Sequence, residues 1–349
     1  MMDGGAVRRY VVRSAGGGSR IVVSGTKGYA ARRYAARGVG VLAGTIAAFV
    51  VPELPTILHP TALFGRLMQH VERVTYRPSR IAGTLYGLAG VVGAIILGMQ
   101  VDRPSRTAGT AVSVGVCTSA YELYAAAERV GTSLGSADIE LAYRELRALV
   151  GRDTEGQSQV DLVRAVVESV AENTVDAIIA PIFYGILAGT PGVVAYRAIN
   201  TLDAMVGYRN TRYADFGWFS ARLDDYANWV PARLAVLATA ISAPRRARYV
   251  VQQALSHAKE HPSPNAGIIE AAFAAALGIR LGGVNYYDGM PVMTPVYDGG
   301  RAVCTADIQR AVTLSRKVSV LGACISYILV GGCAAALSAM AISTKESRG

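Results

Sequence analysis

The sequence predicts an all-α protein, a polytopic helical membrane protein with large polar helical loops. Of its 349 residues, 52% are hydrophobic and only 17% are charged, whereas a soluble domain carries about 25% charged residues. Three uncharged runs, 81–101, 177–196 and 318–344, reach the roughly 20 residues that a membrane-spanning helix requires. Composition and run length therefore both favour insertion into a bilayer.

The first 37 residues form a basic N-terminal arm. They contain eight Lys or Arg residues and one acidic residue, Asp3, so the arm supplies +7 of the formal net charge of +10. No nucleic-acid recognition motif or stacking pattern accompanies these charges, so nucleic acid is not an expected partner. The positive-inside rule favours an arm that holds the N-terminus at the cytoplasmic face. Residues 38–349 are expected to form a single helical membrane domain.

Two apolar runs near the start of this domain predict a helical hairpin. The linker between 81–101 and 107–127 is short, so these two helices should pack together. Along the first helix, glycines recur at a spacing that permits close packing: Gly83, Gly87, Gly90 and Gly93. With 318–341 as a third span, the N-terminus and every polar motif lie on the cytoplasmic side.

The polar parts of the domain are expected to carry the catalysis. They are the segments 52–80, 128–233 and 243–317. Their pattern is mostly helical, but Leu281–Gly300 is rich in Gly and Pro and predicts a long irregular loop.

The run 177–196 differs from the other apolar runs. It contains Pro181, Pro191 and three glycines, which favour a kinked or broken helix. Polar side chains flank it on both sides, and they would face opposite compartments if the run crossed the membrane simply. If they form one site, the run must be re-entrant or packed inside the protein.

Acidic side chains precede this run at helical spacing. Arg164, Glu168, Glu172 and Asp176 lie four residues apart and would form one stripe on a helix. A solvated face with an Arg–Glu pair explains the first two equally well. It explains Asp176 less well, because this residue adjoins the apolar run, where an unpaired carboxylate is costly. A divalent cation relieves repulsion between neighbouring carboxylates, and hard oxygen ligands favour magnesium over zinc.

Further polar groups follow the run and suit a magnesium–phosphate site, in which carboxylates hold the cation and arginines grip phosphate oxygens. They are Asn200 and Asp203 on one helical face, then Asp224, Asp225 and Asn228 between Arg222 and Arg233. A capping cluster at a helix start is the open alternative for the second group. Downstream, the turn Ser263-Pro264-Asn265 is suited to present backbone N–H groups to an anion, or to act only as a cap.

The sequence contains no GxxxxGKS or GxxxxGKT phosphate loop and no HExxH zinc helix. If the protein uses a nucleotide, carboxylate-held magnesium and arginines must bind it.

The order of these motifs resembles the CobD/CbiB family of cobalamin-biosynthesis membrane proteins, the adenosylcobinamide-phosphate synthases. The resemblance spans roughly residues 59–317, about three quarters of the chain. Its blocks are His59-Pro60, Leu149-Val150-Gly151-Arg152-Asp153-Thr154, Glu168-Ser169-Val170-Ala171-Glu172-Asn173-Thr174-Val175-Asp176, the stretch 196–208, Arg222-Leu223-Asp224-Asp225, Pro231-Ala232-Arg233-Leu234, Ser263-Pro264-Asn265-Ala266-Gly267 and Glu270. Two features depart from the family pattern: the basic arm, and Pro52-Glu53-Leu54-Pro55 in place of an acidic stretch before the His-Pro.

The resemblance implies synthesis of adenosylcobinamide phosphate. The carboxylate of adenosylcobyric acid, a corrinoid, would form an amide with the amine of aminopropanol phosphate or a related amino-alcohol phosphate. A carboxylate does not condense with an amine unaided, so activation by ATP and Mg²⁺ through an acyl phosphate is the natural hypothesis. Other late cobalamin-pathway membrane enzymes are candidate partners.

Residue roles follow from combining the resemblance with the patterns above. The catalytic set is Glu168, Glu172, Asn173, Asp176, Asp224 and Asp225, one of whose carboxylates would act as general base for the amine. The magnesium set is Glu172, Asp176, Asp203 and Asp225. The nucleotide- and phosphate-binding set is Asn200, Asp203, Arg209, Arg222, Asn228, Arg233, Ser263 and Asn265.

The expected location is the cytoplasmic membrane, with several passes through the lipid bilayer and the active site facing the cytoplasm. Two other classes of function stay open. A membrane transporter also carries acids at a broken helix, but its usual second interrupted repeat is missing. A non-catalytic membrane sensor related to the family is the other, and the complete polar set argues against it.

Overall fold

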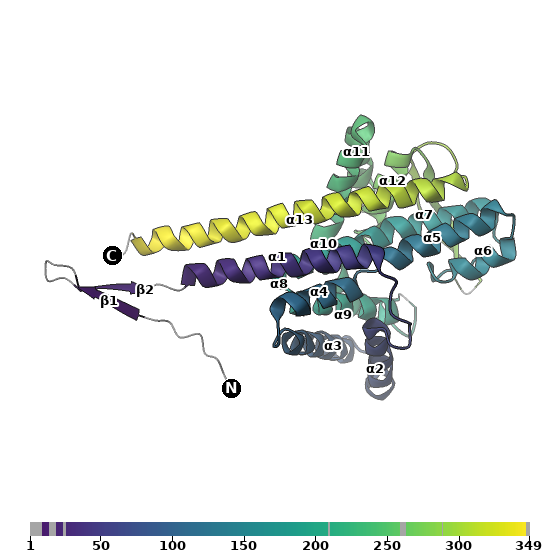
Figure 1. Ribbon diagram of the computed structural model, residues 1–349. Helices are drawn as coiled ribbons and strands as arrows, with labels where there is room; N and C mark the ends of the chain where they lie inside the picture. Colours follow the sequence, from purple (N-terminus) through teal and green to yellow (C-terminus); the bar gives the residue numbers. More distant parts are fainter. Residues whose placement is uncertain are drawn as a thin grey trace.

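The computed structural model describes residues 9–13, 19–23, 26–208, 210–258, 263–287 and 289–346, and side chains between 36 and 330 within these ranges. Helices dominate it, which confirms the predicted all-α class (Figure 1). The helices are α1 (Thr26–Val50), α2 (Pro60–Thr75), α3 (Arg80–Val101), α4 (Arg106–Cys117), α5 (Ala120–Gly135), α6 (Ile139–Leu146), α7 (Gln159–Asn173), η1 (Thr174–Ile179), α8 (Ala180–Ala188), α9 (Thr190–Val206), α10 (Trp218–Ser242), η2 (Pro244–Arg246), α11 (Ala247–Ser256), α12 (Ala266–Leu277) and α13 (Ala306–Glu346). The strands form two antiparallel pairs, β1 (Arg9–Arg13) with β2 (Ser19–Val23) and β3 (Arg280–Tyr287) with β4 (Met290–Asp298).

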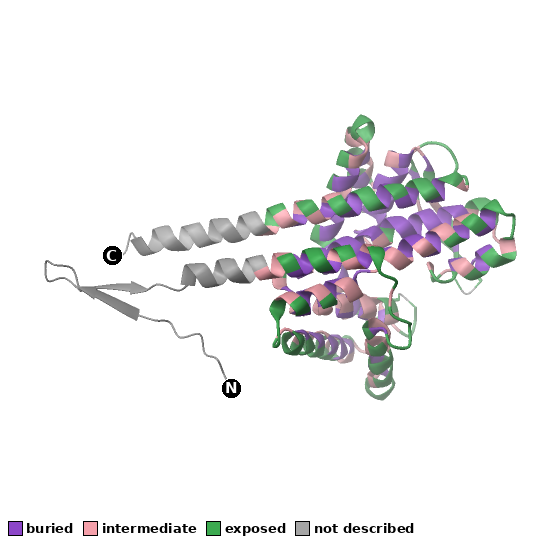
Figure 2. Cartoon of the chain, viewed as in Figure 1, coloured by how far each residue is buried: buried purple, intermediate pink, exposed green. Residues whose placement is uncertain are grey.

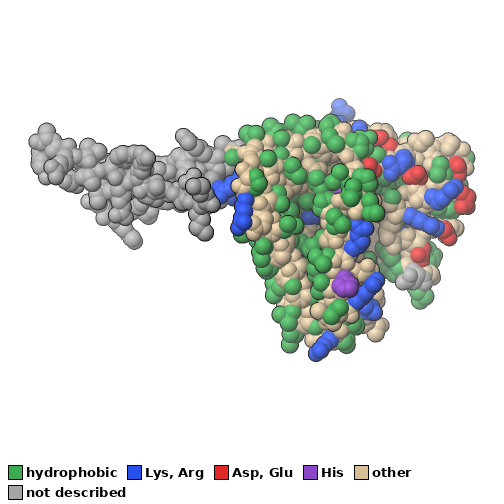
Figure 3. Space-filling view, turned by 60° about the horizontal axis from the view of Figure 1, so that its bottom comes forward, with side chains coloured by type: hydrophobic (Ala, Val, Ile, Leu, Met, Phe, Trp, Pro, Cys, Tyr) green, Lys and Arg blue, Asp and Glu red, His purple; other side chains and the backbone are tan. Residues whose placement is uncertain are grey.

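Within the described residues, three helical stretches are long and apolar enough to cross a membrane: Arg80–Val101, Gln159–Ala188 and Ala306–Val330. The first is α3 and the third lies in α13, so the predicted runs 81–101 and 318–341 are confirmed as apolar helices of spanning length. Large apolar side chains such as Leu85 and Ile96 are exposed on α3. Figure 3 shows a broad hydrophobic face with acidic side chains gathered toward one end. These features indicate a membrane protein.

The predicted span 107–127 is wrong as a single helix. The chain leaves helical geometry at Thr118 and Ser119, which separate α4 from α5. The expected hairpin of this segment with 81–101 is also wrong, because α3 packs mainly on α9, whereas α4 packs mainly on α1 and α9. The glycines of α3 do permit close packing, but of another partner: a Cβ added at Gly98 would lie 2.7 Å from Pro191 Cα at the start of α9.

Helices α7, η1 and α8 form one continuous rod whose middle section is a π-helix. Asp176 lies in this π section, a local geometry that is frequent at functional sites. Pro181 has no backbone N–H, so the carbonyl oxygen of Ala177, four residues earlier, lacks its usual α-helical donor. The backbone N–H of Ser119 donates to that oxygen at 2.9 Å. The proline in the rod and the break between α4 and α5 are therefore structurally coupled.

The chain reverses direction at Gly189, between α8 and α9. Gly189 has φ 69° and ψ −151°, a conformation open essentially only to glycine. Helices α8 and α9 then pack against each other, so the run 177–196 turns back on itself. Gln159–Ala188 is long enough to span a bilayer. However, 72% of the residues in its apolar 18-residue segment are buried inside the protein. This is the re-entrant, internally packed arrangement that a single shared site requires.

The core surrounds α7, whose residues from Leu162 to Ala171 are all buried. Figure 2 shows this buried interior beneath helices with mixed exposure. The elements that cover α7 are α5, α6, α12, α13 and β3. The polar side chains of this buried stretch, Arg164, Glu168 and Ser169, therefore meet protein or internal cavities.

The stretch Leu281–Gly300 is not an irregular loop but mainly the hairpin of β3 and β4. The strands reverse near Gly289, which has φ 74°, and Leu281 and Tyr297 turn inward onto the core. Glycines and prolines concealed the strand pattern. The dipeptide Asp288-Gly289 in the sequence is a common hairpin-turn signal and was the available clue.

The predicted arm 1–37 lies outside the residues whose side chains are described, apart from its last two positions. Within it, β1 pairs with β2, and α1 begins at Thr26.

Candidate functional site

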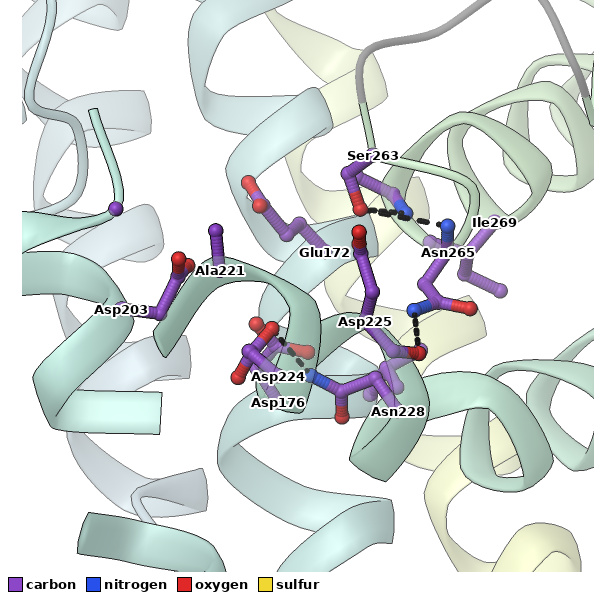
Figure 4. A pocket seen from close by; sticks show the side chains of 13 residues that line it. Glu172, Asp176, Asp203, Ala221, Asp224, Asp225, Asn228, Ser263, Asn265 and Ile269 are labelled. Carbon is purple, nitrogen blue, oxygen red and sulfur yellow. Dashed lines mark hydrogen bonds between the residues drawn. The ribbon is translucent and has the colours of Figure 1, made fainter. Parts of the chain in front are cut away.

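Five carboxylates line one cavity of about 240 Å³ between the rod and helices α9, α10 and α12. They are Glu172 of α7, Asp176 of η1, Asp203 of α9, and Asp224 and Asp225 of α10. Among the described lining residues, none is Lys, Arg or His. Figure 4 shows that these side chains come from different helices and point toward a common space. The cavity is therefore strongly anionic and demands cations or protons.

An asparagine from α9 joins the two sides of this cavity. The Nδ2 of Asn200 donates to Asp176 Oδ2 at 3.2 Å and to Asp224 Oδ1 at 3.4 Å. Arg197, one turn earlier, approaches Asn200 Oδ1 at 3.5 Å and so fixes the orientation of the amide. Two carboxylates that would repel each other are thus held beside one donor group.

A second asparagine, Asn228, anchors the floor of the cavity. Its Nδ2 donates to Asp224 Oδ2 at 3.0 Å, and Tyr196 donates its hydroxyl to Asn228 Oδ1 at 2.9 Å. The same hydroxyl oxygen lies 3.1 Å from the backbone carbonyl oxygen of Asp176. Tyr196 also stacks on Tyr184 with ring centroids 5.2 Å apart. These contacts make Asp224 a fixed group, not a freely rotating one.

The turn before α12 forms the opposite wall. Asn265 Nδ2 donates to the backbone carbonyl oxygen of Asp225 at 2.8 Å, and Arg233 Nη1 donates to Asn265 Oδ1 at 2.8 Å. The Ser263 hydroxyl oxygen accepts the N–H of Ala266 at 3.3 Å, so this serine caps the helix start. Ser263 and Asn265 therefore line the cavity, whereas Arg233 supports the wall from behind.

Burial changes the acidity of the cavity. Desolvation, reinforced by the charges of Asp224, Asp225 and Glu172, raises the pKa of Asp203 to about 7. Desolvation also raises the pKa of Asp224 to about 6, although hydrogen bonds from Asn228 and Asn200 oppose the shift. Gly207 leaves room for the Asp203 carboxylate, because an added Cβ there would overlap Asp203 Oδ1. Groups poised near neutral pH are suited to bind a cation or to exchange a proton.

The carboxylate oxygens of this cavity are of the ligand type that magnesium prefers. Among the described residues, no three His, Cys, Asp or Glu side chains are grouped closely enough to hold a metal ion by themselves. Magnesium does not need one, because it usually keeps several waters and binds one or two carboxylates together with substrate phosphates. Asp176, Asp203, Asp225 and Glu172 provide such oxygens around one space.

Comparison with known proteins gives the family. The model of the CobD/Cbib protein family matches residues 41–315. The chain belongs to the CobD/CbiB family. Membership assigns it a role in cobalamin biosynthesis.

Several curated relatives are called cobalamin biosynthesis protein CobD. The one from Mycobacterium tuberculosis (strain ATCC 25618 / H37Rv) is 42% identical over 303 residues, covering 84% of this chain and 96% of that protein. The one from Geobacter metallireducens is 41% identical over 252 residues, covering 68% and 79%. The one from Clostridium perfringens is 34% identical over 306 residues, covering 83% and 97%. No solved structure matches this chain.

The CobD/CbiB blocks are not all gathered in one cavity. Glu168 lies outside the carboxylate cavity and pairs with Arg152 at 2.7 Å and Arg164 at 3.4 Å. Asn173 lines a different cavity and donates to the carbonyl oxygen of Ser169 at 2.9 Å. Arg222 is exposed, and its Nη1 lies 3.7 Å from Asp225 Oδ2, but it does not line the cavity. Arg209 falls outside the described residues.

Some residues of the site were missed by the sequence reasoning. Tyr196 donates to the side chain of Asn228, and Arg197 donates to that of Asn200. Arg152, Glu270 and Asn285 line the same cavity as Glu168. Apart from Asn285, these residues lie within the sequence blocks that resemble the CobD/CbiB family. Asn285 lies on β3, so recognition of the hairpin was the signal that could have found it.

Proposed function

We propose that this chain is an amide-forming ligase of cobalamin biosynthesis. It joins the carboxylate of adenosylcobyric acid to the amine of an amino-alcohol phosphate, with Mg²⁺ and ATP, and releases adenosylcobinamide phosphate. The single observation that carries the proposal is the convergence of five carboxylates, with no cationic side chain among the described lining residues. Membership of the CobD/CbiB family supports it.

The cavity residues have matching tasks in this reaction. Asp176, Asp203, Asp225 and Glu172 would hold Mg²⁺, which neutralises phosphate charge when it is bound. Asn200 bridges Asp176 and Asp224 through hydrogen bonds at 3.2 and 3.4 Å, and Asn228 orients Asp224 through a third at 3.0 Å. Asp224 stands outside the magnesium set, and burial raises its pKa to about 6, so this carboxylate is suited to take a proton from the incoming ammonium.

The overall reaction balances with ATP as the energy source. A carboxylate and an ammonium give an amide and one water, which is unfavourable in aqueous solution. Phosphoryl transfer from ATP to the carboxylate oxygen leaves ADP and an acyl phosphate. The amine, after losing a proton, attacks the acyl carbon, and phosphate leaves with the oxygen. At about 240 Å³, the cavity admits the carboxylate end of a corrinoid and not its macrocycle, so the ring would remain outside.

The test is an assay on membranes that contain the overproduced chain. Adenosylcobyric acid, aminopropanol phosphate and Mg-ATP are added, and the corrinoid amide is identified by mass. Asp225→Asn is expected to abolish the product while the protein still inserts into the membrane. Asp215→Asn is the matched control, because Asp215 is exposed and pairs with Arg80 outside the cavity. Absence of product, together with ATP turnover that ignores both substrates, would overturn the proposal.

We further infer that the cavity opens to the cytoplasm, where ATP is available. The variants His70→Cys and Glu155→Cys each introduce one cysteine at an exposed position. The first lies in the polar segment before α3 and the second in the polar segment after α5. Both are expected to react with a membrane-impermeant maleimide in inverted vesicles and not in intact cells. Labelling of the two from opposite sides would contradict this topology.

A further inference from the structure

A second cavity, of about 210 Å³, lies beside the carboxylate cavity, and Glu172 lines both. It is bounded by α7, α12, the segment before α7 and the hairpin of β3 and β4. Its volume suits a small molecule and is far too small for a corrin ring. A compartment that shares one wall with a reaction cavity is well placed to hold a second reactant.

One end of this second cavity is cationic. The Arg152 side chain is only 7% exposed, and its Nη1 contacts Glu168 Oε2 at 2.7 Å and also donates to Asn285 Oδ1. Its Nη2 is buried and has no hydrogen-bond partner among the described residues. A buried guanidinium donor left unpaired is costly, and an anionic ligand that accepts from it would remove the cost.

The surrounding contacts fix Arg152 in place. Arg164 donates to Asn285 Oδ1 at 2.9 Å and to the carbonyl oxygen of Val284 at 2.7 Å. Glu168 lies between the two arginines and also accepts the backbone N–H of Gly282 at 2.7 Å. One carboxylate thus serves two guanidinium groups, and Arg152 keeps a spare donor. A spare guanidinium N–H that is held in place is suited to donate to a phosphate oxygen.

The other end of this second cavity is anionic. Glu172 and Glu270 both line it, and Glu270 is 8% exposed. Glu270 makes no hydrogen bond to a described residue. Burial, followed by the charges of Glu168 and Glu172, raises its pKa well above the ordinary value for a glutamate. A bound ammonium group would stabilise both carboxylates at this end.

We propose that the second cavity binds a small phosphorylated primary amine, with its phosphate on Arg152 and its ammonium between Glu172 and Glu270. This assignment rests on the proposed function, and it identifies the compartment that holds the amino-alcohol phosphate. Because Glu172 is the shared wall, the amine end faces the cavity where the activated carboxylate would lie. Glu168 then acts as a positioning residue for Arg152 and does not contact the substrate.

The test is binding to the purified chain in detergent, measured by calorimetry without ATP or corrinoid. The probes are aminopropanol phosphate, inorganic phosphate and aminopropanol. Arg152→Gln is expected to weaken binding of aminopropanol phosphate by roughly tenfold or more. Glu270→Gln is expected to weaken binding of the phosphorylated amine more than that of inorganic phosphate. Arg147→Gln, at an exposed ion pair with Glu155, is the matched control and should bind like the wild type.

The outcomes separate this inference from the proposed function. Arg152-dependent binding with no corrinoid amide product would support the second cavity as a phospho-amine site and refute the ligase. Amide synthesis in Arg152→Gln with an unchanged KM for the amino-alcohol phosphate would overturn the phospho-amine site and keep the ligase. If Arg152→Gln does not fold, the isosteric Glu270→Gln decides, and wild-type affinity of this variant for aminopropanol phosphate would overturn the assignment. In Arg152→Gln or Glu270→Gln, a higher KM for the amino-alcohol phosphate with an unchanged KM for ATP would support the assignment.

Discussion

The side-chain amide of Asn200 donates to Asp176 Oδ2 at 3.2 Å across the chain reversal at Gly189. The two residues are 24 positions apart and lie on opposite sides of an apolar run. If the run crossed a bilayer in one pass, roughly 30 Å of hydrocarbon would separate them. Their contact therefore means that the polar groups before and after the run serve one cavity, and it makes the turn at Gly189 essential to the site.

Replacing Gly189 by Ala should break this arrangement. The backbone conformation at Gly189, φ 69° and ψ −151°, would strain any residue with a Cβ, at a cost of about 1–3 kcal/mol. We expect a lower thermal midpoint in detergent and loss of corrinoid amide synthesis. Gly135→Ala is the control, because an added Cβ there meets no atom within 4 Å. Equal midpoints for the two variants would contradict the role of the turn.

Two glycines on α3 should respond in opposite ways to substitution. A Cβ at Gly83 would overlap the carbonyl oxygen of Phe216, whereas a Cβ at Gly93 would meet no atom within 4 Å. We expect Gly83→Ala to destabilise the protein by about 1–3 kcal/mol through overpacking. Gly93→Ala should be neutral or stabilising by up to about 1 kcal/mol, because Ala favours helices over Gly. Thermal unfolding followed by size-exclusion chromatography measures both, and a reversed order would show that α3 packs elsewhere.

Magnesium should stabilise the purified chain through Asp203. This carboxylate lines the cavity, while the control residue Asp215 is 57% exposed at its side chain and pairs with Arg80. Asp203→Asn is expected to raise the Mg²⁺ concentration for half-maximal thermal stabilisation about tenfold or more. Asp215→Asn should leave it unchanged. An identical Mg²⁺ response in both variants would remove Asp203 from the metal set.

Magnesium binding should weaken as the pH falls from 8 to 6. A carboxyl group must lose its proton to ligate a metal, and the pKa values of Asp203 and Asp224 are raised to about 7 and about 6. Asp203 is therefore mostly ionised at pH 8 and mostly protonated at pH 6, which predicts about a tenfold loss of affinity. Mg²⁺ titrations at constant ionic strength measure it. Equal affinities at the two pH values would show that groups with ordinary pKa values bind the ion.

Much of the site was visible in the sequence because its signals are local. Asp176, Asp203, Asp224, Asp225 and Asn228 stood out as polar residues beside apolar runs, and all of them line the cavity. Glu168 stood out for the same reason, but its ion-pair partners hold it outside this cavity. It is neutralised by Arg152 and Arg164, and its environment depends on Asn285, which lies 121 positions from Arg164 in the sequence. Spacing within one helix cannot reveal such a partner.

The sequence by itself determined the helical class, the apolar runs and the requirement that 177–196 turn back if its flanks share a site. These properties follow from composition, from the conformational limits of Pro and Gly, and from the cost of burying charge. Only the tertiary structure decided that α3 packs on α9 and not on α4, that Leu281–Gly300 is mainly a hairpin, and that Glu172 stands between two cavities. The reason is physical: hydropathy and propensity act over a few residues, whereas the choice of packing partner depends on shape and charge complementarity between surfaces far apart in the chain.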